Sequence, residues 1–310
     1  MAKADQAAVL GIVLAFGACG AEEALVDRPA PAAPGPEPAA PARRRAGPVP
    51  PHVLLAEPPI RPRDAGEFGP PPSPVEPKTI VTLSFDDGLA SQREVPAILA
   101  PWGLRASFFV CSGRVGQEGF LDWDDIRAIA AAGHEIGGHT WDHDQLNALD
   151  DDDAEEAVCR DREELIARGF EPVSFAYPMA GSNDRVAAIV GACGYLSART
   201  NKGVGRPGGG CNTCPAAETL PPVDPLQARS PRSMPSRSSL DDLQDYVTEA
   251  EEEGGWINLT FHEVLGNCRG DGYCIELDVL ADFAAWLAGR EERGTFVRTQ
   301  GEAFALRRKR

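Results

Sequence analysis

Short runs of β-branched and aromatic residues alternate with longer, helix-like stretches over most of the chain after Lys78. Runs of strand length occur at residues 79–85, 105–111, 134–138, 173–177, 195–199, 256–262 and 295–299. Most of the segments between them carry apolar residues at helical spacing, as at Val186, Ile189, Val190 and Cys193. Strands that alternate with helices pair in parallel, so this pattern predicts an α/β fold of seven β/α repeats, closed into a barrel.

Two segments refine this prediction. The helical stretch at 154–168 follows four aspartates, Asp150 to Asp153, and is followed by Gly169. Acidic residues at a helix start and Gly just beyond its end are the usual capping signals, so we interpret the aspartates as caps rather than as a calcium site. Residues 201–239 are rich in Gly, Pro, Ser and Arg and have no clear period. We expect this stretch to be an irregular excursion over the barrel mouth, where substrate-shaping loops belong.

The first 77 residues have a different composition. Lys3 precedes an apolar run at 7–18, which is shorter than the roughly 20 residues of a membrane-spanning helix and predicts an export signal over 1–19. The run ends Ala15-Phe-Gly-Ala-Cys19, which resembles the lipobox of bacterial lipoproteins and makes Cys19 a candidate for lipidation. Ordinary secretion, a retained anchor and a buried helix are the alternatives. Pro, Ala and Gly dominate residues 20–77, which we expect to form a disordered tether before a folded domain at 78–308.

These features predict an exported protein, held at the bacterial cell envelope as a lipoprotein or secreted, with membrane contact only through the lipid. The chain carries a formal net charge of −17 and has a pI near 4.7. Such acidity argues against a nucleic-acid partner, because phosphates repel it, and favours a neutral or cationic substrate.

The residues best suited to chemistry follow strand-like runs. Asp86 and Asp87 end the first run, His139 and His143 stand four apart in His-Thr-Trp-Asp-His, and His262 closes a late run. One Asp and two His leave a divalent ion with open positions, and the second Asp is then free to act as a base. Tyr177 and Pro178 also follow a strand-like run. Active sites of parallel barrels assemble at the carboxyl ends of the strands, where all these residues fall.

Cysteines add a second set of predictions, since export permits disulfides. Cys159 and Cys193 lie on the apolar faces of successive helices and are candidates for a bridge. Cys211 and Cys214, and likewise Cys268 and Cys274, are spaced for local bridges within loops. A zinc site made of those four sulfurs is the alternative, although the second spacing fits it poorly. Cys111 ends a strand and is expected to be a buried thiol.

The motifs Ser84-Phe-Asp-Asp-Gly88, His139-Thr-Trp-Asp-His143, Phe175-Ala-Tyr-Pro178 and Leu259-Thr-Phe-His262 resemble, in order and spacing, those of the polysaccharide deacetylases of carbohydrate esterase family 4. The resemblance spans roughly residues 78–305 and implies a distorted (β/α)7 barrel of the NodB-homology type. It implies Asp86 as the catalytic base, His262 as the general acid, and Asp87, His139 and His143 as ligands of one divalent ion, zinc by family habit. A backbone N–H near Tyr177 and Pro178 would bind the oxyanion.

The chain departs from the family pattern in two places. Ala176 stands where the family carries an Arg that holds the base, and we leave Arg199 and Arg232 as candidates for its replacement. The Asp that orients the acid histidine has three candidates, Asp224, Asp241 and Asp242.

The resemblance implies metal-dependent hydrolysis of N-linked acetyl groups in a polysaccharide or oligosaccharide that contains N-acetylglucosamine. An esterase for O-acetylated glycans such as xylan is the first alternative, because an ester needs the acid less than an amide does. A catalytically silent glycan-binding module is the second alternative, and the missing Arg motivates it.

Overall fold

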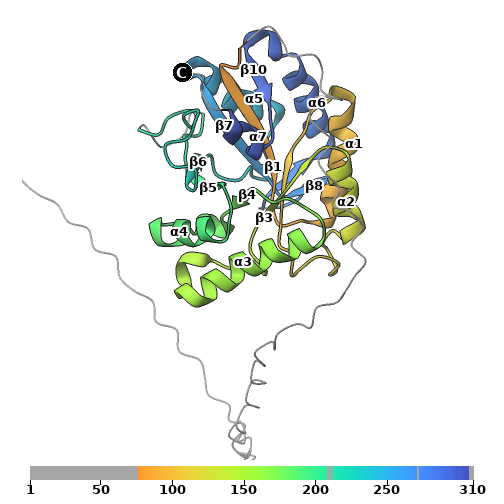
Figure 1. Ribbon diagram of the computed structural model, residues 1–310. Helices are drawn as coiled ribbons and strands as arrows, with labels where there is room; N and C mark the ends of the chain where they lie inside the picture. Colours follow the sequence, from red (N-terminus) through yellow and green to blue (C-terminus); the bar gives the residue numbers. More distant parts are fainter. Residues whose placement is uncertain (1–75, 208–210, 212, 271, 307–310) are drawn as a thin grey trace, which may run out of the picture. The chain divides into compact units, whose positions relative to one another are not determined.

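The computed structural model describes residues 76–207, 211, 213–270 and 272–306 of the 310-residue chain (Figure 1). The predicted export signal, Cys19 and nearly all of the predicted tether lie outside these residues. No helix in the described part of the chain combines the length and the apolar character that crossing a membrane requires.

A parallel sheet with helices packed on it forms the domain, as the alternating pattern predicts. The sheet strands are β1 (Thr79–Phe85), β2 (Ser107–Val110), β3 (Glu135–Gly138), β4 (Ser174–Ala176), β5 (Ser197–Gly203), β6 (Ala228–Ser230), β7 (Gly255–Phe261) and β10 (Thr295–Val297). The seven predicted runs each overlap one of these strands, with ends that agree within a few residues, and β6 is additional. The predicted α/β barrel is therefore confirmed as a curled, all-parallel sheet.

Strand β1 is the centre of this sheet and is buried along its whole length. It pairs with β7 from Thr79 to Phe85 on one side. On its other side, β10 pairs with residues 79–81 and β2 with residues 84 and 85. The order then continues through β3, β4 and β5 to β6. A backbone hydrogen bond of 2.8 Å from the Met234 N–H to the Thr260 carbonyl links the chain after β6 to β7 and brings the sheet's two edges together.

The helices are α1 (Val95–Leu99), α2 (Trp123–Ala131), α3 (Asp151–Ala167), α4 (Asp184–Ala192), α5 (Leu240–Glu253), α6 (Leu277–Ala288) and α7 (Gln300–Ala305). In Figure 1, α1, α2 and α6 lie along one side of the sheet, and α3 and α4 lie together below it. The side chain of Asp150 caps α3 by accepting a 2.9 Å hydrogen bond from the Asp153 N–H. This cap agrees with our interpretation of the acidic run.

The prediction of an irregular excursion at 201–239 is wrong in two places. Strand β5 runs on to Gly203, and β6 lies inside the stretch and pairs with β5 through a register shift. Polar residues fill these strands, so hydrophobic periodicity gave no signal for them. A short two-stranded parallel sheet, β8 (Glu263–Leu265) and β9 (Cys274–Glu276), follows His262 and was likewise not predicted.

Candidate active site

Three of the predicted residues converge at the carboxyl ends of β1 and β3. The carboxylate of Asp87 and the imidazoles of His139 and His143 each offer one ligand atom, and these atoms lie within 4.8 Å of one another. Asp87 Oδ1 is 3.3 Å from His139 Nε2 and 3.2 Å from His143 Nε2. Within the described residues, this Oδ1 is buried and makes no well-formed hydrogen bond, as expected of an atom placed for a metal ion.

A tight turn separates the two neighbouring aspartates. Asp86 continues the ladder of β1, and its N–H donates to the Phe261 carbonyl at 3.0 Å. Asp87 then adopts a left-handed conformation (φ 74°), followed by Gly88 (φ 71°), where an added Cβ would lie 3.1 Å from Val110 Cγ1. Asp tolerates this region better than most residues, and such backbone strain is concentrated at functional sites. The turn points the two carboxylates in different directions within one site.

Hydrogen bonding fixes the orientation of His139. This side chain is buried, and its Nδ1 lies 2.7 Å from the Ala176 carbonyl. A carbonyl only accepts, so Nδ1 carries the proton and the Nε2 lone pair faces Asp87 and His143. Burial alone would lower the pKa of His139, but the carboxylates of Asp86 and Asp87 raise it. Burial alone would raise the pKa of Asp87, but the two imidazoles hold it well below its ordinary value. The three residues thus suit a divalent cation.

Arg199 answers one of the two questions that the sequence leaves open. Its Nη2 donates to Asp86 Oδ1, and both side chains are buried. Nη1 donates to Asn201 Oδ1 at 2.8 Å, and the guanidinium lies 5.1 Å from the Phe109 ring centroid. The other candidate, Arg232, is exposed. Arg199 therefore pairs with Asp86 and leaves Asp86 Oδ2 buried with no hydrogen-bond partner among the described residues.

None of the three candidate aspartates is hydrogen-bonded to His262 Nδ1. This nitrogen is buried and has no hydrogen-bond partner in the described part of the chain. Asp242 instead caps α5 with Ser239, and Asp224 accepts the Leu226 N–H at 2.8 Å. Asp241 lies in the first turn of α5. Burial lowers the pKa of His262, although Asp86 and Asp87 are close enough to oppose this shift.

Neither Tyr177 nor Pro178 offers a free backbone N–H of its own, and an oxyanion-binding N–H near them stays a prediction. Tyr177 is buried, its N–H donates to the Arg199 carbonyl at 3.1 Å, and its hydroxyl donates to the Leu226 carbonyl at 2.7 Å. Pro178 has no N–H and is also buried. The N–H thus ties the end of β4 to β5, and the hydroxyl ties it to the segment before β6. Met179, the next residue, is 60% exposed and has a left-handed backbone (φ 51°).

Sequence reasoning missed Asp161, which lies buried on α3 behind the metal-ligand cluster. Its Oδ1 accepts the Ser112 N–H at 2.9 Å and the Ser112 hydroxyl at 2.5 Å, and its Oδ2 accepts the His139 N–H at 3.1 Å. Burial raises the pKa of Asp161 to about 7. The signal was present in the sequence, because Asp161 shares the apolar face of α3 with Val158 and Leu165.

The structure contains the three disulfides expected from the sequence, Cys159–Cys193, Cys211–Cys214 and Cys268–Cys274. The first joins α3 to the end of α4. Sulfurs bonded to each other offer no thiolate, so the four-cysteine zinc site is wrong for this structure. Cys111 is a buried free thiol, and its Sγ donates to the His139 carbonyl at 3.3 Å.

Comparison with known proteins agrees with the resemblance seen in the motifs. Residues 74–198 match the family model described as polysaccharide deacetylase. A chitin deacetylase from Colletotrichum lindemuthianum is 32% identical over 126 residues, which cover 39% of this chain and 50% of that protein. The peptidoglycan-N-acetylglucosamine deacetylase PgdA from Listeria monocytogenes is 27% identical over 115 residues, covering 36% of this chain and 24% of that protein. The chain thus spans half or less of the length of these relatives.

Solved structures with a similar fold include esterases of family 4. An acetyl xylan esterase from Clostridium thermocellum is 18% identical, with a TM-score of 0.49 over 74% of this chain and 91% of that one. A carbohydrate esterase from Streptomyces lividans is 19% identical, with a TM-score of 0.46 over 70% of this chain and 90% of that one.

Proposed function

We propose that this chain, a member of the polysaccharide deacetylase family through residues 74–198, is a metal-dependent hydrolase that removes N-linked acetyl groups from a glycan containing N-acetylglucosamine. The observation that carries the proposal is the convergence of Asp87, His139 and His143 beside the buried pair of Asp86 and Arg199. The names of the chitin and peptidoglycan relatives support an acetamido sugar as the substrate.

Asp87, His139 and His143 would hold one divalent ion, and zinc suits a site of two imidazoles and one carboxylate. Such an ion, when bound, polarises a carbonyl and acidifies water. The chain's contribution to the metal site is the fixed orientation of His139. The bond from its Nδ1 to Ala176 and the bond from its N–H to Asp161 hold both the ring and the backbone in place.

Asp86 is placed to act as the base. Arg199 donates to Oδ1 and orients the carboxylate, while Oδ2 has a free lone pair to accept a proton from the attacking water. His262 would donate a proton to the nitrogen as the carbon–nitrogen bond breaks. Amide hydrolysis needs such an acid, because an amine anion is a poor leaving group.

One observation favours a second candidate function, the hydrolysis of O-acetyl esters. His262 Nδ1 has no carboxylate partner among the described residues, so no such hydrogen bond stabilises the protonated imidazole that a general acid requires. An alkoxide leaves more readily than an amine anion, so an ester tolerates a weaker acid. The third alternative, a silent binding module, was motivated by the missing Arg. The pairing of Arg199 with Asp86 favours an enzyme over that alternative.

The enzyme would act on its glycan outside the cell. We propose that the chain is exported by its N-terminal signal, either secreted or held by a lipid on Cys19 at the cell envelope, and that its partner is the acetylated glycan itself. Its net charge of −17 suits a neutral polysaccharide.

The test is acetate release from a panel of glycans. The protein, expressed in an oxidising compartment, is offered N-acetylglucosamine oligomers, peptidoglycan and acetylated xylan, before and after chelation and after zinc is restored. Release from the N-acetylated substrates, lost on chelation and regained with zinc, is the expected result. His139→Ala is the matched control and should bind little metal. Acetate release that persists in the chelated enzyme and in His139→Ala would contradict the proposal, and release from xylan alone would favour the esterase.

A further inference from the structure

An exposed aromatic ring lies against His262. The rings of Tyr273 and His262 are stacked, with centroids 5.1 Å apart and planes inclined by 29°. Tyr273 is nevertheless 55% exposed, although an aromatic residue of this size usually buries more of its surface. One part of the ring therefore covers the imidazole, while more than half of the residue faces solvent beside the site.

Strand register explains why these two rings meet. In the small sheet, Glu263 of β8 pairs with Cys274 of β9 in parallel. His262 and Tyr273 each stand one position before these residues, so they are neighbours across the two strands. The Glu263 N–H donates to the Tyr273 carbonyl at 3.1 Å and extends the ladder to this position. The placement of the ring follows from the sheet and not from a chance contact of a loop.

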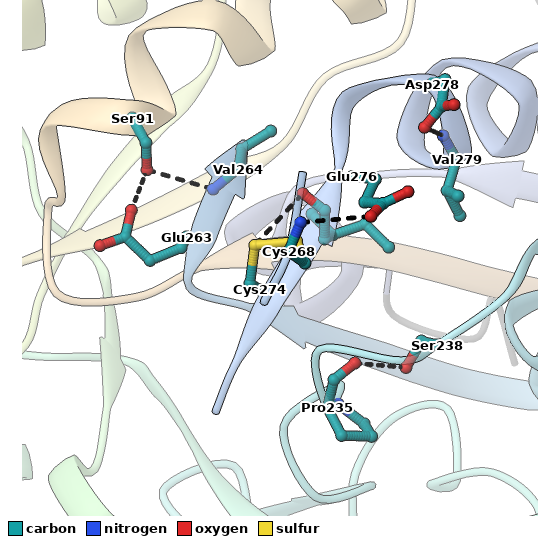
Figure 2. The surroundings of a disulfide bond; sticks show 11 residues. Ser91, Pro235, Ser238, Glu263, Val264, Cys268, Cys274, Glu276, Asp278 and Val279 are labelled. Atoms are coloured by element: carbon teal, nitrogen blue, oxygen red, sulfur yellow. Dashed lines mark hydrogen bonds between the residues drawn. A yellow bond between two sulfur atoms is a disulfide. The ribbon is translucent and has the colours of Figure 1, made fainter. Parts of the chain in front are cut away.

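A disulfide holds the sheet in place. Cys274, directly after Tyr273, is bonded to Cys268, and the Cys268 N–H donates to Glu276 Oε1 at 3.2 Å (Figure 2). On the other strand, the Val264 N–H donates to Ser91 Oγ at 3.1 Å, which ties β8 to the segment before α1. Tyr273 is thus preorganised, and binding against its ring costs little ordering entropy.

We propose that Tyr273 is a glycan-binding residue of this site, a stacking wall for the sugar ring next to the acetamido group that is hydrolysed. This inference rests on the proposed function, in which His262 protonates the amine of that sugar. A residue that stacks on His262 borders the same sugar. Aromatic side chains offer an apolar face to the C–H groups of a pyranose, and they line most sites for small uncharged ligands.

Two readouts separate glycan binding by Tyr273 from a structural role. The first is calorimetric binding of N-acetylglucosamine tetramer and pentamer to the metal-loaded Asp86→Asn variant, in which turnover does not interfere. The second is KM and kcat for the same oligomers in the active enzyme, beside kcat/KM for a small aryl acetate that has no sugar ring.

Tyr273→Ala should weaken oligomer binding and raise KM by about tenfold, which corresponds to the loss of one stacked aromatic contact. It should leave turnover of the aryl acetate within about twofold, and Tyr273→Phe should behave like the wild type. Trp102→Ala removes another exposed aromatic, 45% exposed in the 3-10 turn Ala100–Trp102 that leads from α1 toward the start of β2, and should change neither readout.

The disulfide provides an independent arm of the test. Replacing Cys268 and Cys274 together by Ser should raise KM for the oligomers in the same direction as Tyr273→Ala. The same double replacement at Cys211 and Cys214, another local disulfide, should not. Unchanged binding and KM in Tyr273→Ala would overturn the inference, as would equal losses on oligomers and aryl acetate. Oligomer binding that depends on Tyr273, with no acetate released by the wild type, would refute the proposed function and leave only the glycan-binding role of Tyr273 standing.

Discussion

Arg199 gives the sharpest prediction, because the sequence motif has no Arg at the expected place. In the parallel pairing of β4 and β5, Ala176 is the register partner of Arg199. The guanidinium that reaches Asp86 thus comes from one strand further along the sheet. We predict that Arg199→Ala disables the base, and that adding Ala176→Arg to it restores much of the lost activity. The double variant keeps the same two side chains in the same buried layer.

The size of the effect follows from burial. The side chains of Arg199 and Asp86 are 0% and 1% exposed, so removing the guanidinium leaves an uncompensated buried carboxylate. Breaking such a pair costs about 3–5 kcal/mol, a large share of a typical domain's stability of about 5–15 kcal/mol. We expect kcat to fall at least tenfold and at most about 10⁴-fold, the upper end of what a general base contributes.

The assay combines acetate release, denaturant unfolding and metal analysis. Arg229→Ala is the matched control. It breaks the 2.7 Å ion pair with the buried Glu218, which bridges to Trp256 near the amino end of β7, away from His262. This variant should lose about 1.5–3 kcal/mol of stability and keep its kcat. A folded, metal-loaded Arg199→Ala enzyme with wild-type kcat would refute the reasoning.

Three further outcomes are expected. Asp86→Asn should keep its metal and lose roughly 10²–10⁴-fold in acetate release, whereas Asp87→Asn should lose metal and regain some activity at high zinc; metal loss in Asp86→Asn would reverse the assignment. Replacing Cys159 and Cys193 by Ser should lower the free energy of denaturant unfolding by up to about 4 kcal/mol, given a loop of 34 residues, and an unchanged midpoint would contradict this. Burial lowers the pKa of His134 from 6.5 to about 4, so the folded state resists its protonation. Stability should fall by up to about 3 kcal/mol as the pH drops through that window, and His134→Gln should flatten the slope.

Strands and helices were predictable from the sequence wherever their apolar residues recur at a regular spacing. Strand β1 is apolar and wholly buried, and both its limits were predicted. Strands β6 and β8 are short, and polar or charged residues make up much of them, so the sequence offered no contrast there. The cysteines were predictable for a different reason. Two pairs are so close in sequence that few partners compete, and the third pair lies on two helix faces that pack together.

The ligand cluster was predictable because each member directly follows a strand or belongs to one short motif. Tyr177 illustrates the limit of this reasoning. It also follows a strand, but its N–H donates to the Arg199 carbonyl and its hydroxyl donates to the Leu226 carbonyl. Position in the sequence alone does not distinguish a residue that lines the site from one that packs beside it. Position in the sequence also did not identify a partner for His262 among the three candidate aspartates. Asp242 caps the N-terminus of α5, and Asp224 accepts a backbone N–H within its own loop, as short acidic side chains commonly do.

Strand register explains the partners that the motifs did not reveal. Arg199 reaches Asp86 from the position paired with Ala176, and Tyr273 reaches His262 from the position just before β9. In a parallel sheet, residues in register stand side by side at one edge, whatever their distance along the chain. A chain can therefore supply a group needed at a fixed point of the barrel from either of two adjacent strands. For this fold, a missing motif residue is best sought first at its cross-strand partner, because that position offers nearly the same reach into the site.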